Sequence, residues 1–288
     1  MVIIRPPSEA NSFLLPVTAG CSNNTCTFCG TYNGIKFKVR LLEDVKQDID
    51  EVAQNYNRSV RRVFLENGDA LIVPQNILVE VLRHLNKMFP CLERIGSYAT
   101  PRASLRKTVD ELKELNELGL KIVYLGVETG DDILLQKIRK GATCDQIVEA
   151  GRKLKQAGIT TSATVILGLG GVDGSENHAR KTGEILTDID PDFAGALTLM
   201  LVPGTPLYND WKEGRFSLIS PFQALTELKL IIQNSDFTDC FFTANHASNY
   251  LPIRAQLPRQ KAEVIKLIDD VLARKDMSRL RPEFIRAL

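Results

Sequence analysis

The chain has 288 residues, and its 36 Lys and Arg against 35 Asp and Glu give a formal net charge of +1. A hydrophobic fraction of 44% and a charged fraction of 25% are typical of globular proteins, which excludes a disordered or fibrous protein. The balanced charge argues against a strong nucleic-acid footprint, because nucleic-acid-binding domains carry a clear basic excess. No apolar run approaches the roughly 18 residues that a membrane helix needs, so we expect no membrane association.

The segment that begins at Met1 has no charged region followed by an apolar stretch, so the sequence predicts no signal peptide and a cytoplasmic protein. In that compartment six cysteines favour metal or redox chemistry over disulfides. Three of the six lie within nine residues, at Cys21, Cys26 and Cys29, and the others are scattered singly.

Short apolar, β-rich runs alternate along the chain with segments of helical periodicity. The runs predict strands at Phe13–Thr18, Arg62–Leu65, Arg94–Tyr98, Lys121–Val127, Thr160–Leu167 and Ala194–Val202. Between them apolar residues recur every three or four positions, beginning with Leu42, Val45 and Ile49. Strands that alternate with helices indicate right-handed βαβ units and a parallel sheet.

Capping residues define some of the helices further. Thr108 with Glu111, and Thr143 with Gln146, have the spacing of capping boxes at helix starts, and Gly158 is a helix stop. After Pro203 the alternation ends. Two amphipathic helices, around Phe222–Gln233 and Arg259–Arg274, flank an irregular stretch with no obvious strand partner. We therefore expect one α/β domain with a C-terminal helical elaboration.

In parallel α/β sheets the functional site lies at the C-terminal ends of the strands. The loops at those ends are Ala19–Thr31, Glu66–Leu71, Ser97–Arg102, Glu128–Asp132, Gly168–Gly174 and Val202–Leu207. They are also the most unusual segments of the sequence, which favours this assignment of the strands.

The first of these loops carries the cysteine triplet. A structural zinc site normally needs four protein ligands, and the nearest alternatives, His84 and Cys91, belong to another helix and the loop after it. A [4Fe–4S] cluster can instead be held at three irons, which leaves the fourth iron open to a further ligand. The alternative is three structural thiols, but buried cysteines do not usually cluster beside Gly and Asn.

The loop resembles that of the radical S-adenosylmethionine (SAM) enzymes, whose signature is C-x3-C-x2-C with an aromatic residue before the last cysteine, as Phe28 is here. In this chain four residues separate Cys21 from Cys26, so the first span is wider. The resemblance implies a partial (β/α)6 TIM-like barrel in residues 1–210. Residues 211–288 would then be an extension that packs on the barrel and covers its mouth.

Further motifs follow in the order of that family. They imply that SAM is bound by Phe28, Gly68, Asp69, Glu128, Ile166, Gly168 and Val202. Two positions depart from the family pattern, because Asn67 replaces a glycine and Gly171 stands where a glutamate is usual.

Several of these residues have a structural alternative. Gly68 could only turn the chain, Glu128 could cap the helix at Asp131, and Gly168 could only permit close packing. Elsewhere, His178 is expected to be solvated, and Cys144 to be a half-buried, inert thiol.

The resemblance implies reductive chemistry with two cofactors, a [4Fe–4S] cluster and SAM. An electron from an external flavodoxin- or ferredoxin-like donor would cleave SAM to a 5′-deoxyadenosyl radical, which abstracts hydrogen from a substrate. A small molecule or a peptide fits as substrate better than a nucleic acid. The alternative is a non-catalytic iron–sulfur electron carrier or a zinc-stabilised binding module.

Substrate-facing residues are sought where polar side chains gather near the predicted mouth. Tyr98 lies at a strand end, and the segment 241–252 brings His246, Asn249 and Tyr250 together between apolar flanks. We predict that these side chains face the substrate, with His246, Tyr98 and Tyr250 as candidate catalytic residues. The alternative for the segment is a turn-rich connector whose polar residues cap backbone groups.

Overall fold

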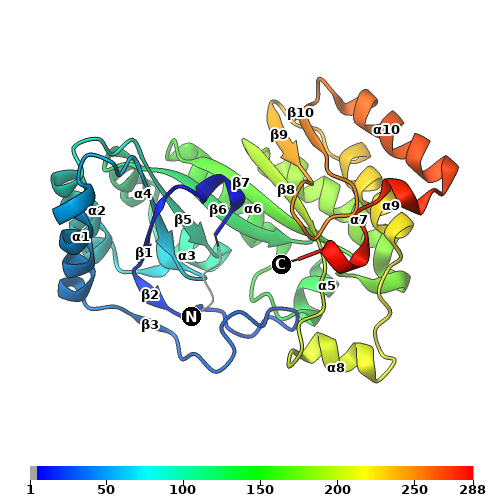
Figure 1. The fold of residues 1–288 in the computed structure, drawn as a ribbon, viewed down its shortest axis with the longest axis horizontal. Helices are drawn as coiled ribbons and strands as arrows, with labels where there is room; N and C mark the ends of the chain where they lie inside the picture. The colour runs from blue at the N-terminus through cyan, green and yellow to red at the C-terminus, as the bar shows by residue number, and fades with distance from the viewer. Residues whose placement is uncertain (1–4, 288) are drawn as a thin grey trace. The chain divides into compact units, whose positions relative to one another are not determined.

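The computed structural model describes residues 5–287, so the first four residues of the segment examined for a signal peptide lie outside it (Figure 1). Its strands are β1 (Phe13–Pro16), β2 (Thr18–Ala19), β3 (Lys38–Val39), β4 (Arg62–Glu66), β5 (Arg94–Ala99), β6 (Leu120–Glu128), β7 (Thr160–Leu167), β8 (Phe193–Thr198), β9 (Cys240–Thr243) and β10 (Arg254–Leu257). Its α-helices are α1 (Leu42–Tyr56), α2 (Gln75–Met88), α3 (Pro101–Arg106), α4 (Val109–Glu117), α5 (Asp132–Lys137), α6 (Cys144–Gln156), α7 (Gly171–Ile189), α8 (Pro206–Lys212), α9 (Pro221–Gln233) and α10 (Lys261–Arg274). Short 3-10 turns are η1 (Pro7–Glu9), η2 (Ala70–Ile72), η3 (Met277–Arg279) and η4 (Glu283–Ile285).

The predicted helix caps are confirmed. Thr108 and Glu111 exchange side chain–backbone hydrogen bonds at the start of α4, and Thr143 and Gln146 do the same at the start of α6. Gly158 has a φ of +73° just after α6, which places it in the left-handed region that ends many helices. None of the helices in residues 5–287 is both long and apolar enough to cross a membrane.

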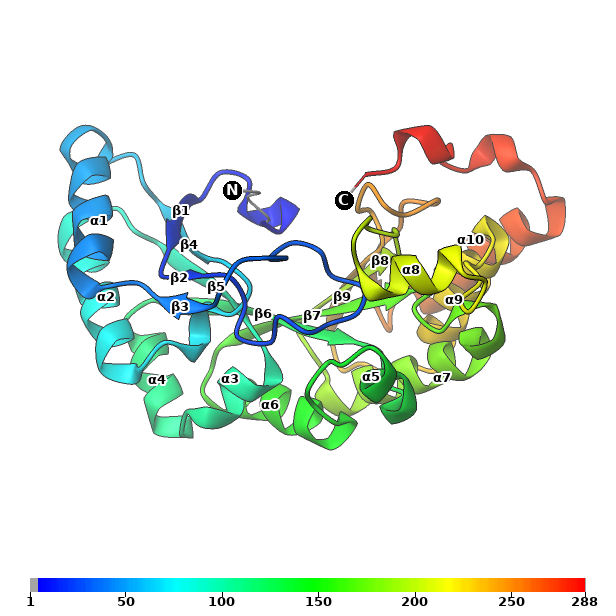
Figure 2. The ribbon, with the colours of Figure 1, turned by 90° about the horizontal axis from the view of Figure 1, so that it is seen from below.

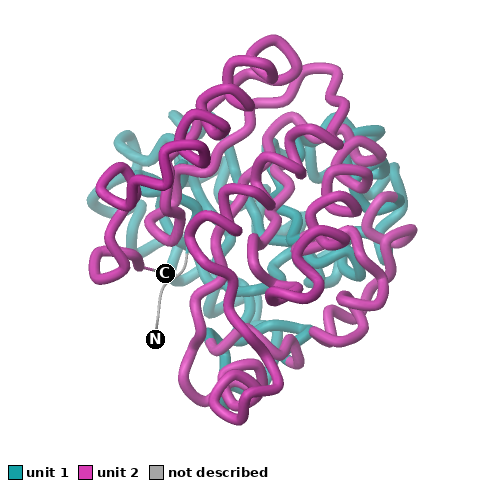
Figure 3. The backbone as a smooth tube through the Cα atoms, turned by 90° about the vertical axis from the view of Figure 1, so that its right-hand side faces the viewer, with its two compact units in different colours: residues 1–24, 31–126, 149–161 teal, residues 25–30, 127–148, 162–288 magenta. Residues whose placement is uncertain are grey.

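The chain divides into two compact units, which are drawn in teal and magenta in Figure 3. Unit 1 comprises residues 1–24, 31–126 and 149–161, and unit 2 comprises residues 25–30, 127–148 and 162–288. The boundaries therefore fall inside β6, α6 and β7, and inside the cysteine loop. These units differ from the division expected from the sequence, which has a core of residues 1–210 and an extension of residues 211–288. That division stays a prediction.

In unit 1 the strands β1, β4, β5 and β6 are parallel, with Leu15 opposite Leu65 and Tyr98 opposite Tyr124. Helices α1 and α2 pack against each other on the outer side of these strands (Figure 2). Their apolar faces are fully buried, as Ile49 and Leu82 show. Burial of such a side chain contributes about 1.5–3 kcal/mol, so this face stabilises the unit.

In unit 2 strand β8 pairs in parallel with both β7 and β9, and β10 closes the edge antiparallel to β9. Helix α7 packs along α9, and α9 packs along α10 (Figure 1). The buried core of this unit includes Leu186, Leu228, Ile231 and Phe242. The α/β class and the mostly parallel pairing that the sequence predicts are both confirmed.

The C-terminal part differs from the prediction, because the stretch between α9 and α10 contains the strands β9 and β10. Each strand has four residues and is stabilised by partners that only the fold brings beside it, β8 and β10 for β9, and β9 for β10. The sixth predicted strand, in turn, ends at Thr198 and not at Val202. The first predicted strand is interrupted after Pro16, since Thr18–Ala19 pairs antiparallel with Lys38–Val39.

Candidate active site

Cys21 lies directly against Gly68, in the turn that follows β4. A Cβ atom at residue 68 would come 2.6 Å from the Cys21 Cβ and 2.9 Å from the Cys21 Sγ, closer than real Cβ atoms come. The ring of Tyr32 closes the same space from another side, 2.8 Å from that position. Gly68 therefore does more than turn the chain, because it provides the space that the first cysteine fills.

Asp69, the next residue, ties this turn to the cysteine loop. Its side chain is fully buried and accepts hydrogen bonds from the Ser22 hydroxyl and from the backbone N–H and hydroxyl of Thr100, both at 3.0 Å. Ser22 follows Cys21, and Thr100 caps helix α3. The carboxylate thus fixes the backbone beside the first cysteine, and its role toward SAM stays a prediction.

Cys26 and Cys29 belong to unit 2, in the segment 25–30. The backbone of Thr27 is held on both sides, since its N–H donates to the Ile138 carbonyl and its carbonyl accepts from the Leu207 N–H, both at 2.9 Å. The Cys26 Sγ lies 3.9 Å from the carbonyl oxygen of Arg139. The end of α5 and the start of α8 therefore fix this part of the cysteine loop.

Gly30 ends the segment against Val202. A Cβ atom at residue 30 would come 2.6 Å from the Val202 Cγ1, so only glycine fits there. Phe28 is partly buried and packs on the core of unit 2. Val202 thus contacts the end of the cysteine loop.

Three thiols on one loop are the type of donor that an iron–sulfur cluster takes. All three are partly exposed, and the absence of a side chain at Gly68 and at Gly30 makes room for Cys21 and for Val202, respectively. Within residues 5–287 no group of three or more His, Cys, Asp or Glu side chains is arranged to hold a metal ion. Because Cys21 belongs to unit 1 and the other two to unit 2, the triad as a ligand set stays a prediction.

Glu128 ends β6 in a left-handed conformation, with a φ of +66°. Its carboxylate forms a 2.6 Å ion pair with Lys140, and both side chains are nearly buried. It does not cap α5, because the Asp131 carboxylate accepts the Ile133 and Leu134 N–H groups there. The capping alternative for Glu128 is therefore wrong. Its positive φ costs a non-glycine residue about 1–3 kcal/mol and often marks a functional position.

Ile166 and Gly168 lie at the end of β7 in unit 2. The Ile166 carbonyl accepts a hydrogen bond from His178 at 3.0 Å. Gly168 has a φ of +80°, and its N–H donates to the Glu227 carboxylate at 2.6 Å. Gly168 therefore forms a positive-φ turn that a buried side chain holds, which is more than close packing.

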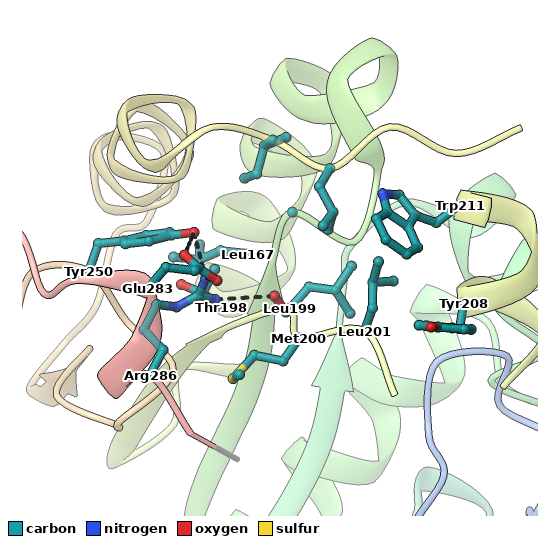
Figure 4. A pocket seen from close by; sticks show the side chains of 13 residues that line it. Leu167, Thr198, Leu199, Met200, Leu201, Tyr208, Trp211, Tyr250, Glu283 and Arg286 are labelled. Carbon is teal, nitrogen blue, oxygen red and sulfur yellow. Dashed lines mark hydrogen bonds and ion pairs between the residues drawn. The ribbon is translucent and has the colours of Figure 1, made fainter. Parts of the chain in front are cut away.

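A cavity of about 450 Å³ lies at the ends of β7 and β8. Figure 4 shows two kinds of wall: the rings of Tyr208 and Trp211 on one side, and Tyr250, Glu283 and Arg286 on the other. Apolar side chains separate them, namely Leu167, Leu199, Met200, Leu201, Leu218 and Ile219. Mostly apolar walls with a few polar groups are typical of small-molecule sites.

Of the three polar residues predicted in segment 241–252, Tyr250 lines this cavity. Its hydroxyl donates to Glu283 at 3.0 Å and accepts from Arg286 at 2.5 Å, and the guanidinium lies over the ring. Burial raises the pKa of Tyr250 to about 12, so the phenol is neutral at pH 7.

The other two residues are held by the surrounding backbone. Asn249 is buried and bonds to Thr198 and to the carbonyl of Ala196, so it fixes the end of β8. His246 is partly buried, and its Nδ1 bonds to the Ser248 hydroxyl at 2.9 Å. Burial and the nearby Arg281 lower the pKa of His246. Neither residue is part of the cavity wall.

Tyr98 belongs to unit 1, where its ring packs edge-on against Phe64 and Tyr124. Burial raises the pKa of its hydroxyl. The ring is therefore part of an aromatic cluster, and a catalytic role stays a prediction.

Sequence patterns do not identify two buried polar residues of unit 2, His178 and Glu227. His178, expected to be solvated, is fully buried, because the turn after β6 and the end of β7 both contact it. Glu227 on α9 is also fully buried. Only the spacing of His178 and Thr182, one turn apart on α7, could have indicated a shared contact.

Cys144 is half-buried as expected, and burial raises its pKa to about 12, which keeps the thiol protonated.

Comparison with known proteins finds relatives that act on RNA. A tRNA-2-methylthio-N(6)-dimethylallyladenosine synthase of Bordetella avium is 27% identical over 217 residues, which are 70% of this chain and 44% of that protein. A tRNA uridine(34) acetyltransferase of Methanocaldococcus jannaschii is 30% identical over 108 residues, 37% of this chain and 20% of the relative. The chain thus spans from a fifth to about half the length of the curated relatives it matches.

Solved structures share the fold. The match to coproporphyrinogen III oxidase of Escherichia coli, a radical SAM enzyme, covers 77% of this chain and 51% of that protein's chain. Its TM-score is 0.60 and the sequence identity is 18%. The match to methylornithine synthase covers 78% of this chain and 63% of that protein's chain, with a TM-score of 0.54 and 22% identity. The mixed α/β architecture with a mostly parallel sheet is therefore that of radical SAM partial barrels.

The family model of the radical SAM superfamily matches residues 15–181, more than half of the chain. The matched range contains the cysteine loop, the Gly68 turn, Glu128 and Gly168. Enzymes of this family carry a [4Fe–4S] cluster and bind SAM, which leaves the non-catalytic alternative without support. The chain belongs to the radical SAM superfamily and is an enzyme with these two cofactors.

Proposed function

We propose that Cys21, Cys26 and Cys29 hold a [4Fe–4S] cluster and that the enzyme cleaves SAM reductively to act on a substrate by hydrogen abstraction. When bound, the cluster supplies the electron that breaks the sulfonium–C5′ bond of SAM, giving methionine and a 5′-deoxyadenosyl radical. The observation that carries the proposal is the contact of Cys21 with Gly68, where a Cβ would meet both the Cβ and the Sγ of the cysteine. Gly68 thus gives the first of three thiol donors its place on the loop, and thiolates are the ligands that an iron–sulfur cluster takes.

The chain's own residues would bind and orient the cofactors. Asp69 fixes the backbone on the C-terminal side of Cys21, and the Glu128 carboxylate, oriented by Lys140, would accept hydrogen bonds from polar groups of SAM. Phe28, Ile166, Gly168 and Val202 would supply apolar and backbone contacts. Their shared task is to hold SAM in one orientation and to keep water away from a reactive radical.

The cavity beside Tyr250 is the proposed substrate site. Its mostly apolar walls and its volume of about 450 Å³ support a small molecule or the side chain of a peptide. The curated relatives named as tRNA enzymes support an RNA substrate instead, but those proteins are longer and less than a third identical. An external flavodoxin- or ferredoxin-like protein would supply the electron.

Anaerobic reconstitution tests the proposal. The protein is loaded with iron and sulfide, reduced, and examined by electron paramagnetic resonance with and without SAM, while 5′-deoxyadenosine is measured by chromatography. We expect a cluster signal that SAM perturbs, together with release of 5′-deoxyadenosine. A cluster that ignores SAM would contradict the proposal. Two binding measurements separate an RNA substrate from a small-molecule or peptide substrate. One is a gel-shift titration with unfractionated tRNA, and the other is a competition experiment with metabolite fractions.

A further inference from the structure

Helix α7 buries a histidine between two of the turns proposed to bind SAM. His178 is fully buried, with its Nδ1 2.8 Å from the Thr129 hydroxyl and its Nε2 3.0 Å from the Ile166 carbonyl. Thr129 follows Glu128 after β6, and Ile166 is the next-to-last residue of strand β7. One side chain therefore joins two strand ends that are far apart in the sequence.

The partners determine which ring nitrogen carries hydrogen. A carbonyl oxygen only accepts, so Nε2–H donates to Ile166, and Nδ1 accepts from the Thr129 hydroxyl. The Thr129 oxygen in turn accepts the Asp131 N–H at 3.1 Å. Burial lowers the pKa of His178 to about 4, so the ring is neutral at pH 7. The two ring nitrogens therefore have fixed roles, Nε2 as donor and Nδ1 as acceptor, because exchanging these roles would lose a hydrogen bond.

Thr182 repeats the contact one helical turn later. Its hydroxyl accepts the Gly130 N–H at 3.2 Å and donates to the His178 carbonyl at 2.6 Å. A Cβ atom at residue 130 would come 2.0 Å from the Lys181 carbonyl oxygen, so the backbone of the turn lies directly on α7. The turn after β6 is thus held by two side chains and by close contact.

Glu227 holds the turn after β7 in the same way. Its carboxylate accepts the Gly168 N–H and the Ser175 hydroxyl, both at 2.6 Å, and lies 3.9 Å from the His178 Nε2. The side chains of this network are therefore those of Thr129, Ser175, His178, Thr182 and Glu227, with the Thr182 hydroxyl also 3.3 Å from the His178 Nδ1. It ends at Glu128, Ile166 and Gly168, which are the SAM-binding residues proposed for these two turns.

We propose that His178 is a positioning residue for SAM binding, which sets the Glu128 turn against the end of β7 through the Thr129 and Ile166 bonds. This inference rests on the proposed function, since it concerns how the same site is held in shape. A histidine that only filled the core would be replaceable by an apolar ring without effect on the cofactor. A positioning histidine would not be, because its two directed hydrogen bonds carry the effect.

Four substitutions separate these roles. His178→Asn keeps an acceptor near the Nδ1 position, His178→Gln keeps a donor near the Nε2 position, and Thr129→Val removes the hydroxyl at nearly constant volume. Thr129→Ser restores it. His84→Gln is the matched control, because His84 also lies on a helix with one side-chain partner, Asp50, but belongs to unit 1.

The first measurement needs no cluster. Long-range ¹H–¹⁵N spectra of the histidines in the iron-free protein, assigned with the His84, His178 and His246 variants, report tautomer and titration. We expect His178 to stay neutral with hydrogen on Nε2 from pH 5 to pH 8. Titration of His178 near its ordinary pKa of 6.5 would overturn the inference whatever the enzyme does with SAM.

The second measurement is the SAM dissociation constant of the reconstituted protein, with iron content and thermal midpoint as controls for folding. We expect Thr129→Val and both His178 variants to bind SAM at least about tenfold more weakly at unchanged iron content, and Thr129→Ser and His84→Gln to bind like the wild type. Equal SAM affinity in Thr129→Val and the wild type would overturn the inference. A wild type that holds the cluster but does not bind SAM would overturn the proposed function itself.

Discussion

Gly68 and Cys21 are packed so closely that a single methyl group at residue 68 would displace the cysteine. The added Cβ would be 2.6 Å from the Cys21 Cβ, whereas the same atom at Gly174, on helix α7, meets nothing within 4 Å. The two glycines therefore form a matched pair, one constrained by its neighbour and one open to solvent.

The first prediction uses that pair. Gly68→Ala should lower bound iron by more than half, because the Cys21 backbone must shift to relieve the overlap. Gly174→Ala should keep full iron and raise the free energy of unfolding slightly, by up to about 1 kcal/mol, since alanine is the better helix former. Iron per chain by colorimetry and urea unfolding measure both. Full iron in Gly68→Ala would show that the contact does not position a ligand.

The second prediction concerns the ligands. Cys21→Ala, Cys26→Ala and Cys29→Ala should each lose most of the iron, because three ligands leave no spare. Cys144→Ala and Cys240→Ala are the controls: burial raises the pKa of both thiols to about 12, so neither offers a thiolate at pH 7. The visible absorbance of the reconstituted cluster measures how much iron each variant loses. Retention of full iron in Cys26→Ala would contradict the assignment.

The third prediction separates the two acidic residues. Glu128→Gln should keep the cluster and weaken SAM binding about ten- to a hundredfold, the effect of losing a charged hydrogen bond. Asp69→Asn should lower iron content as well, since Asp69 holds Ser22 beside Cys21. Iron content and SAM titration of each variant give the two patterns. If Asp69→Asn and Glu128→Gln behave alike, the distinction between support and binding is wrong.

The fourth prediction concerns the substrate cavity. Tyr250→Phe removes the hydroxyl that bonds Glu283 and Arg286 in the cavity wall, so turnover of the native substrate should fall while cluster content and SAM affinity stay unchanged. His246→Ala should have the smaller effect, because His246 is not in that wall. Product formation in cell extracts, normalised to iron, compares them. A larger loss in His246→Ala would restore the histidine as the substrate-facing residue.

Local signals in the sequence predicted most of the scaffold. Capping boxes such as Thr108 with Glu111, and apolar runs such as Thr160–Leu167, act over a few residues and were recognisable. The four-residue strands β9 and β10 were not, because their pairing with β8 and with each other supplies the stability that their own pattern lacks. His178 was misassigned for the same reason: its partners, Thr129 and Ile166, are brought to it only by the fold.

The last prediction concerns pH and the buried pair of Glu227 and His178. Burial raises the pKa of Glu227 from 4.5 to about 7 and lowers that of His178 from 6.5 to about 4. The stability that Glu227 contributes is fully present below pH 4.5 and is lost as pH rises through 7. The stability linked to His178 is present above pH 6.5 and is lost as pH falls through 4.

The two effects are each on the order of 3 kcal/mol and oppose each other between pH 4.5 and 6.5, so the wild type should show a shallow dependence there. Besides His178, Glu227 faces the Ser175 hydroxyl and the Gly168 N–H. Besides Glu227, His178 faces the Thr129 and Thr182 hydroxyls, the Ile166 carbonyl and the Asp131 carboxylate. Glu227→Gln removes the pH dependence that arises from Glu227 and leaves the one that arises from His178. The free energy of unfolding of this variant should therefore rise clearly from pH 4.5 to 6.5. Urea unfolding of both proteins at half-unit intervals measures the difference, and parallel curves would mean that Glu227 titrates as an ordinary exposed carboxylate.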